Sequence, residues 1–359
     1  MAAQNDNHII VKLLLEQERI EIGPSTFYGC TKMTEIELPS FIETIPEDLF
    51  GYCSSLTQIK IPSSVKKIGK YAFEKCVSLK TMTIPSSVVI IDDYAFSGCS
   101  NLSEIPIPPS VIEIGKYAFE ECSSLIKVSI PSSLKSIVYG IFMKCTSLNE
   151  VKIPSNITFI EPYSFSKCNS LKYVEIPSSV TAIGQYAFME CSLIELTIPS
   201  SVKIIGRAVF QNCSLLESII LPSSMTNIES AAFSDCSSLV EINLPSSILK
   251  IEDYTFKKCS SLKQIVIPPS VTSIGVAAFQ YCSSLLNISI PSSVISVGNC
   301  AFFGCNSLEQ AIIESVNISF GKSVFDKCCS LREISIPSVN DIKEGTFPAN
   351  VMINKQFIY

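Results

Sequence analysis

Cysteine recurs along this chain at a fixed interval, and its side chain is capable of three kinds of chemistry. Fourteen of the sixteen cysteines stand three residues after a phenylalanine, from Cys30 to Cys328. A thiolate can bind zinc, pair in a disulfide or act as a nucleophile. Each role needs a partner: further metal ligands, a second sulfur facing the first, or a base.

The spacing of the cysteines disfavours all three roles. Zinc sites usually contain cysteines roughly two to four residues apart, whereas these are 22 or 23 apart and His8 is the only histidine. Equivalent side chains in stacked turns point in parallel rather than at each other, which disfavours disulfides. Asn350 stands where a fifteenth cysteine is expected. A position that accepts either cysteine or asparagine is typical of a buried site for a compact side chain that can form a hydrogen bond. The sequence therefore predicts a ladder of buried free thiols. Cys300 and Cys329 fall outside it and are exposed, reactive or paired.

The phenylalanines define a repeat that covers the chain. They follow one another at steps of 23 residues, with two steps of 22: Phe27, Phe50, Phe73, Phe96, Phe119, Phe142, Phe165, Phe188, Phe210, Phe233, Phe256, Phe279, Phe302, Phe325 and Phe347. A fixed period of this size is typical of a solenoid. We expect a single solenoid over residues 1–359, with a degenerate N-terminal cap repeat at 1–26, regular repeats at 27–347 and a C-terminal cap strand at 348–359.

One repeat, residues 56–78, shows what each position does. An L-x-x-I-x-I pattern alternates as a strand does, and Pro62 ends that strand because proline has no N–H to donate. Two serines follow, whose hydroxyls can cap local backbone groups. A second extended stretch has the pattern V-x-x-I, and the segment around Phe73 suits a short helical or 3₁₀ turn.

The unit L-x-x-I-x-I-P-S-S-V-x-x-I-G-x-x-A-F-x-x-C-S-S resembles the treponemal-type leucine-rich repeat of the BspA-like proteins, and it recurs over nearly the whole chain. The resemblance implies a right-handed leucine-rich-repeat solenoid, mostly β with short helical or 3₁₀ turns. It implies a parallel sheet along one face and about fifteen repeats of 23 residues. It also implies a surface antigen, located at the cell surface or outside the cell, that binds host proteins or neighbouring cells.

Composition and motifs exclude several functions. The net charge of −6 and the absence of a basic block argue against nucleic-acid binding, and no apolar run is long enough to span a membrane. No phosphate loop, nucleophile elbow, histidine base or metal cluster is recognisable, which predicts a non-enzyme without cofactor or metal. The N-terminus lacks the basic region of a signal peptide. An intracellular scaffold in the cytoplasm is therefore an alternative, and a structural rod is a third. We expect a monomer with a protein ligand.

Two surfaces are candidates for that ligand. The first, the charged patch, comprises outward positions of the L-x-x-I-x-I strands: Glu104, Lys127, Glu150, Lys152, Lys172, Tyr173 and Glu175. Mixed charge with an aromatic residue suits a protein interface, although a solvated surface has the same composition. The second, the tyrosine flank, comprises residues two before a repeat phenylalanine: Tyr71, Tyr94, Tyr117, Tyr163 and Tyr186. Stacked tyrosines can anchor a partner, or they can simply pack half-buried over the turns.

Overall fold

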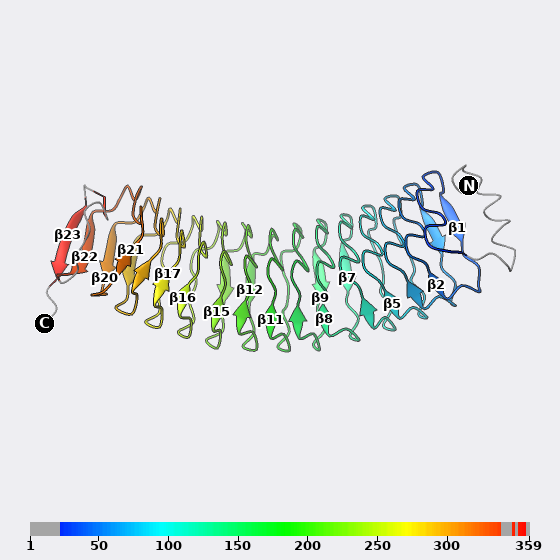
Figure 1. Ribbon diagram of the computed structural model, residues 1–359, viewed down its shortest axis with the longest axis horizontal. Coiled ribbons are helices and arrows are strands. Elements are labelled where there is room, and N and C mark those ends of the chain that lie inside the picture. Colours follow the sequence, from blue (N-terminus) through cyan, green and yellow to red (C-terminus); the bar gives the residue numbers. More distant parts are fainter. Residues whose placement is uncertain (1–21, 339–346, 349–350, 357–359) are drawn as a thin grey trace. The chain divides into compact units, whose positions relative to one another are not determined.

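The computed structural model describes residues 22–338, 347–348 and 351–356. The chain divides into two compact units, Met1–Ser179 (unit 1) and Val180–Tyr359 (unit 2). Each unit is a parallel β-solenoid whose successive turns lie side by side (Figure 1). The expected N-terminal cap lies almost entirely outside the described residues, and the division into caps and regular repeats stays a prediction.

The L-x-x-I-x-I pattern forms one row of strands. In strands such as Lys127–Ser129, Glu150–Lys152, Glu195–Thr197 and Ser218–Ile220, exposed outward side chains alternate with a buried apolar residue, as period-two alternation requires. In unit 1 these strands are β1 (Glu35–Glu37), β3 (Gln58–Lys60), β7 (Lys127–Ser129) and β9 (Glu150–Lys152). In unit 2 they are β12 (Glu195–Thr197), β14 (Ser218–Ile220), β18 (Asn287–Ile290), β20 (Gln310–Ile313), β22 (Glu333–Pro337) and β23 (Met352–Gln356).

The V-x-x-I pattern, expected as a second extended stretch, forms a second row of short parallel strands in addition to the expected parallel sheet. In unit 1 these strands are β2 (Thr44–Ile45), β4 (Lys67–Ile68), β5 (Ile90–Ile91), β6 (Glu113–Ile114), β8 (Ser136–Ile137) and β10 (Phe159–Ile160). In unit 2 they are β11 (Ala182–Ile183), β13 (Ile204–Ile205), β15 (Asn227–Ile228), β16 (Lys250–Ile251), β17 (Ser273–Ile274), β19 (Ser296–Val297) and β21 (Ser319–Phe320).

Pairing within both rows is parallel and joins equivalent positions of adjacent turns. In unit 1, β1 pairs with β3, β7 with β9 and β8 with β10, and β2-β4-β5-β6 form a four-stranded sheet. In unit 2, the sheets run β11-β13-β15, β12-β14, β16-β17-β19-β21 and β18-β20-β22-β23. The terminal strand β23 adds a last parallel strand to the L-x-x-I-x-I row.

The core of each unit is a stack of phenylalanine rings. In unit 1 the rings from Phe27 to Phe165 follow one another at centroid distances of 5.3 to 5.8 Å. In unit 2 the rings from Phe188 to Phe325 stack at 5.1 to 5.9 Å. Offset stacking at such distances adds to the free energy of apolar burial. A turn gains this contact only from a neighbour, so one turn cannot fold alone.

The segment around each phenylalanine is not a helix, although it contains the i→i−3 hydrogen bonds of a 3₁₀ turn. The amides of Ala72, Glu74 and Cys76 donate to carbonyls three residues back in their own turn. The amides of Tyr71, Phe73 and Lys75, between them, donate to carbonyls of the next turn. This alternation arises because the residues two before and two after the phenylalanine have positive φ, 55° at Tyr71 and 56° at Lys75. No helix occurs in residues 22–338.

The Pro-Ser-Ser turns differ from the expectation of local caps. The second serine donates its hydroxyl to the neighbouring turn instead, to a carbonyl 22 residues earlier: Ser64 to Ile42, Ser87 to Val65 and Ser110 to Val88, at 2.6 to 2.8 Å. Asn156 makes the same contact with its amide, to the carbonyl of Leu134. These serines therefore join turns rather than terminate strands.

Replacing a non-glycine residue at one of the left-handed positions by glycine should stabilise the folded chain. Ala231 has φ 58° and donates its amide to the carbonyl of Asp253. A left-handed conformation costs an L-residue about 1–2 kcal/mol, and glycine costs roughly 0.5–1 kcal/mol in added unfolded-state entropy. Ala231→Gly should therefore raise the free energy of unfolding by about 0.5–1 kcal/mol in chemical denaturation. Ala232→Gly is the control: Ala232 is fully buried and has ordinary φ, so its loss should destabilise. Equal destabilisation by both changes would contradict the analysis.

Candidate functional site

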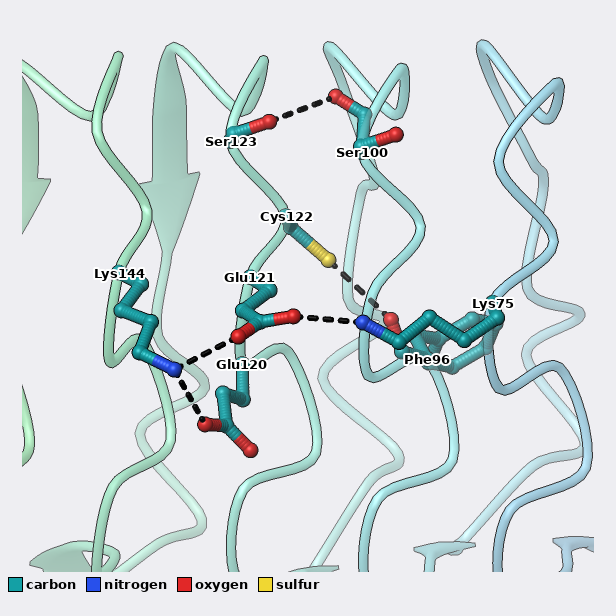
Figure 2. Close-up of polar contacts among 8 residues, drawn as sticks. All are labelled: Lys75, Phe96, Ser100, Glu120, Glu121, Cys122, Ser123 and Lys144. Atoms are coloured by element: carbon teal, nitrogen blue, oxygen red, sulfur yellow. Dashed lines mark hydrogen bonds and ion pairs between the residues drawn. The ribbon is translucent and has the colours of Figure 1, made fainter.

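The cysteine ladder is structural. The fourteen cysteines in register are all buried, and all sixteen are free thiols. The Cys99 Sγ–H donates to the carbonyl of Phe73, 3.1 Å away in the preceding turn, while the amide of Cys76 donates to the same oxygen. The thiol thus satisfies the second lone pair of a buried carbonyl. Figure 2 shows the equivalent contact from Cys122 to Phe96.

Burial also makes most of these thiols poor nucleophiles; Cys328 differs, because a hydrogen bond with Cys305 lowers its pKa. Desolvation raises the pKa of Cys76 and of Cys213 to about 12, and it raises the pKa of Cys99 and Cys122 well above the usual range. A thiol that stays protonated at neutral pH is a weak nucleophile and a weak metal ligand. Within residues 22–338, no group of three or more His, Cys, Asp or Glu is placed to hold a metal ion.

The two cysteines outside the ladder are more accessible. Cys329 is exposed, and Cys300 is half-buried at a left-handed position two residues before Phe302. Neither forms a disulfide.

Thiol titration of the native chain should therefore detect about two sulfurs. An aromatic disulfide reagent at neutral pH should react rapidly with Cys329, more slowly with Cys300, and with the buried thiols only after denaturant is added, because unfolding is needed to expose and ionise them. A Cys300→Ser, Cys329→Ser double variant is the control and should show almost no native reaction. Rapid reaction of many thiols in that variant would rule out a buried ladder.

The charged patch lies on the L-x-x-I-x-I face of unit 1, and all seven of its residues are exposed. Lys127 of β7 stands opposite Glu150 of β9, and Lys152 stands two residues further along β9, opposite Ser129. Glu104 makes an isolated parallel bridge with Thr81 one turn earlier. Lys172, Tyr173 and Glu175 occupy the next repeat, where the chain is extended without forming a strand. Tyr173 is 57% exposed.

The charged side chains of this patch do not pair with other charged side chains of the described residues. Among the residues that the structure describes, no ion pair involves any of its lysines or glutamates. The structure places the residues on one face but does not test whether a partner binds them.

The tyrosine flank forms a stack in unit 1. Tyr71 stacks on Tyr94 at 5.0 Å and Tyr94 on Tyr117 at 4.9 Å, and all three rings are half-buried at left-handed positions. Desolvation, followed by a hydrogen bond with Tyr139, raises the pKa of Tyr117 above its ordinary value. Tyr186 has the same left-handed conformation in unit 2. The half-burial agrees with packing over the turns, and anchoring of a partner stays a prediction.

Tyr139 also belongs to this stack, although its membership was not predicted from the sequence. Its ring lies 5.3 Å from that of Tyr117 and 5.5 Å from that of Tyr163. It stands three residues before Phe142 instead of two, and Gly140 takes the left-handed position with φ 60°. A Cβ on Gly140 would collide with the ring of Tyr117. The sequence did contain a signal for this position: Tyr139 is followed directly by a glycine, whereas a tyrosine is followed by alanine in several other repeats.

An ion-pair cluster on unit 1 was also missed. Lys75 and Lys144 approach Glu121 from opposite sides, each with Nζ 2.6 Å from a carboxylate oxygen, and Lys144 also lies 3.6 Å from Glu120 (Figure 2). Lys75 reaches Glu121 across two turns because Gly98 in the intervening turn has no side chain to block it. Hydrogen bonds from Lys144 and Lys75 lower the pKa of Glu121 to about 2. Burial raises the pKa of Glu120.

Glu121 should stabilise unit 1 in a pH-dependent way. Its folded pKa lies below the ordinary value of 4.5, so its contribution is complete above about pH 4.5 and is lost as the pH falls through about 2. Because the cluster is partly exposed, we expect Glu121→Gln to cost only about 0.5–1 kcal/mol at pH 7, and less in 1 M salt, by the magnitudes typical of screened pairs. Urea denaturation at several pH values measures this. Glu217→Gln, on an exposed residue of unit 2, is the control. A loss that is equal at pH 7 and pH 2 would contradict the assignment.

The geometry defines the class of the protein: a parallel β-solenoid repeat protein with a core of stacked phenylalanines and buried thiols. A search of curated proteins gave no match. The family model described as BspA type leucine rich repeat region (6 copies) matches residues 20–149, 135–263 and 250–358. The chain belongs to this family. Leucine-rich repeats of this kind are suited to protein–protein interaction, and the fold is typically non-enzymatic.

Solved structures agree with this assignment. A leucine-rich repeat protein from Bacteroides ovatus is 33% identical over 94% of this chain and 88% of its own, with a TM-score of 0.87. A leucine rich cell surface protein from Faecalibacterium prausnitzii is 28% identical over 84% of this chain and 87% of its own, with a TM-score of 0.56. The pneumococcal vaccine antigen PcpA, 19% identical with a TM-score of 0.61 over 94% and 92% of the two chains, shares the fold. Among the described residues, no helix is long and apolar enough to cross a membrane.

Proposed function

We propose that this chain is a protein-recognition module of the cell surface, and that the charged patch of unit 1 contacts its ligand. The observation that carries the proposal is a set of exposed charges without partners around an exposed tyrosine. Lys127 and Glu150 alternate across β7 and β9, and Tyr173 stands 57% exposed in the adjoining repeat. Tyrosine in a polar surround is typical of the residues that dominate protein interfaces.

The surface location rests on similarity. The relative from Faecalibacterium prausnitzii is described as a cell surface protein. The alternative, an intracellular scaffold, is favoured by one observation: the described residues contain sixteen cysteines and no disulfide. Free thiols are typical of a reducing compartment. The buried position of most of these thiols weakens that argument, because a sulfur that reagents cannot reach is protected in either compartment.

Surface biotinylation of intact cells that make the protein distinguishes the two. An abundant cytosolic protein serves as the leakage control. Labelling of the chain supports the surface role. Absence of labelling, with the intact chain in the cytosol, favours the scaffold.

The charged patch is tested by substitution. Lys127→Ala, Lys152→Ala and Tyr173→Ala together should abolish capture of the ligand that the wild-type chain retains, because they remove two of the three lysines of the patch and its aromatic anchor. Loss of such an anchor alone typically costs about 2 kcal/mol or more. The affinity of wild type and variant for the same captured protein is the measurement. A control variant carries Gln264→Ala, Asn287→Ala and Ser289→Ala on the equivalent face of unit 2. Unchanged affinity in the first variant would exclude the patch.

A further inference from the structure

Unit 2 contains a shallow groove of about 630 Å³ that is lined mainly by residues with polar side chains. Five consecutive repeats line it, and each contributes the left-handed residue two after its phenylalanine and the residue one after its cysteine. The left-handed positions include Asp235, Lys258 and Tyr281. The residues after the cysteines include a row of four serines, Ser214, Ser237, Ser260 and Ser283.

The serine hydroxyls present acceptors to the groove. Three of them donate their protons to the carbonyl of the equivalent residue one turn earlier: Ser237 to Ser214, Ser260 to Ser237 and Ser283 to Ser260, all at 3.3 Å. A hydroxyl has one proton and two lone pairs, so an oxygen that donates along the row still accepts hydrogen bonds. The groove thus offers a row of acceptors, with one for each turn.

The groove carries no net charge at its centre. Asp235 and Lys258, from adjacent turns, form an ion pair with Nζ 3.1 Å from Oδ1. Asn212 and Asn306 at the two ends add neutral amides. A lining in which the charges neutralise each other does not favour an anionic or a cationic polymer.

An aromatic ring stands in the same groove. Tyr281 is 40% exposed and has φ 61°. Its ring lies over Gly304, where a Cβ would come within 2.6 Å of Cδ1, and it meets Phe303 edge-on at 5.5 Å. Glycine and phenylalanine therefore fix the orientation of a ring that solvent can still reach.

We propose that this groove binds a neutral, extended oligosaccharide. Sugar hydroxyls would donate to the row of serines, and the C–H face of one sugar ring would rest on Tyr281. Adjacent turns lie about 4.8 Å apart, which is close to the length of one sugar unit, so consecutive sugars meet equivalent acceptors. A peptide fits less well, because the serines leave no apolar pockets for side-chain anchors. This site lies in unit 2 and does not depend on the role of the charged patch.

Calorimetric titration of the full chain tests the proposal. The probes are four neutral hexasaccharides, namely cellohexaose, xylohexaose, β-1,4-mannohexaose and chitohexaose, with hexagalacturonate as an anionic probe of the same length. We expect at least one neutral probe to bind with a Kd of about 0.1–1 mM, as is reasonable for an open polar site. Hexagalacturonate should bind at least tenfold more weakly.

Variants place the binding in the groove. Tyr281→Ala should weaken binding at least tenfold, and Ser260→Leu should do so independently by filling the middle of the groove. Tyr254→Ala is the control: Tyr254 is 41% exposed and left-handed but does not line the groove, so its loss should leave binding unchanged. Circular dichroism confirms that each variant is folded. The proposal is overturned by no binding of any neutral probe, by equal or stronger binding of hexagalacturonate, by unchanged binding in folded Tyr281→Ala and Ser260→Leu, or by equal weakening in Tyr254→Ala.

Discussion

The alternating hand of the backbone around each phenylalanine is the constraint on which the rest of the structure depends. Residues two before and two after the ring are left-handed in almost every repeat, and most are not glycine. Each costs about 1–2 kcal/mol. The alternation turns every second amide towards the next turn, where it forms a hydrogen bond with a net value of about 0.5–1.5 kcal/mol. The conformation is therefore favourable only when a neighbouring turn supplies the acceptor and the stacked ring, which explains why the repeats are stable together and not alone.

The same constraint places the side chains of the tyrosine flank, the ion-pair cluster and the groove of unit 2. A left-handed residue lies in a sharp bend, and its side chain leaves the core along one flank of the solenoid. Residues two before the phenylalanine give the stacked tyrosines, such as Tyr94 and Tyr117. Residues two after it give the Lys75–Glu121–Lys144 cluster in unit 1 and Tyr281 with the Asp235–Lys258 pair in unit 2. Side chains in both rows contact side chains one or two turns away, so their chemistry depends on several repeats rather than on one residue.

The sequence was sufficient to predict the interior and the stacked tyrosines Tyr71, Tyr94 and Tyr117, and insufficient to predict the left-handed backbone or the contacts that skip a turn. The period of phenylalanine and cysteine fixed the solenoid, its strands and its buried thiols, because these positions contact their own equivalents in the next turn. The left-handed positions were missed, since Tyr71 and Lys75 are not glycines and a pattern of ordinary residues predicts ordinary φ. The contact between Lys75 and Glu121 was missed because it skips the turn that contains Gly98. Interactions of that kind depend on side-chain reach, which spacing along the chain does not reveal.

The one short repeat inside the regular series shows which positions can change. Between Phe188 and Phe210 a residue is missing, and the deletion falls between Cys191 and Leu193, both of which remain buried. The interior register is thus kept, and the change is absorbed by a surface turn. Ser201 lies in the Pro-Ser-Ser turn that follows, and its hydroxyl is the only side-chain oxygen or nitrogen in the described residues that is buried without a hydrogen-bond partner. Unpaired burial of this kind costs about 1–3 kcal/mol. Within this chain the stacked interior therefore varies least from repeat to repeat, and the outward side chains vary most.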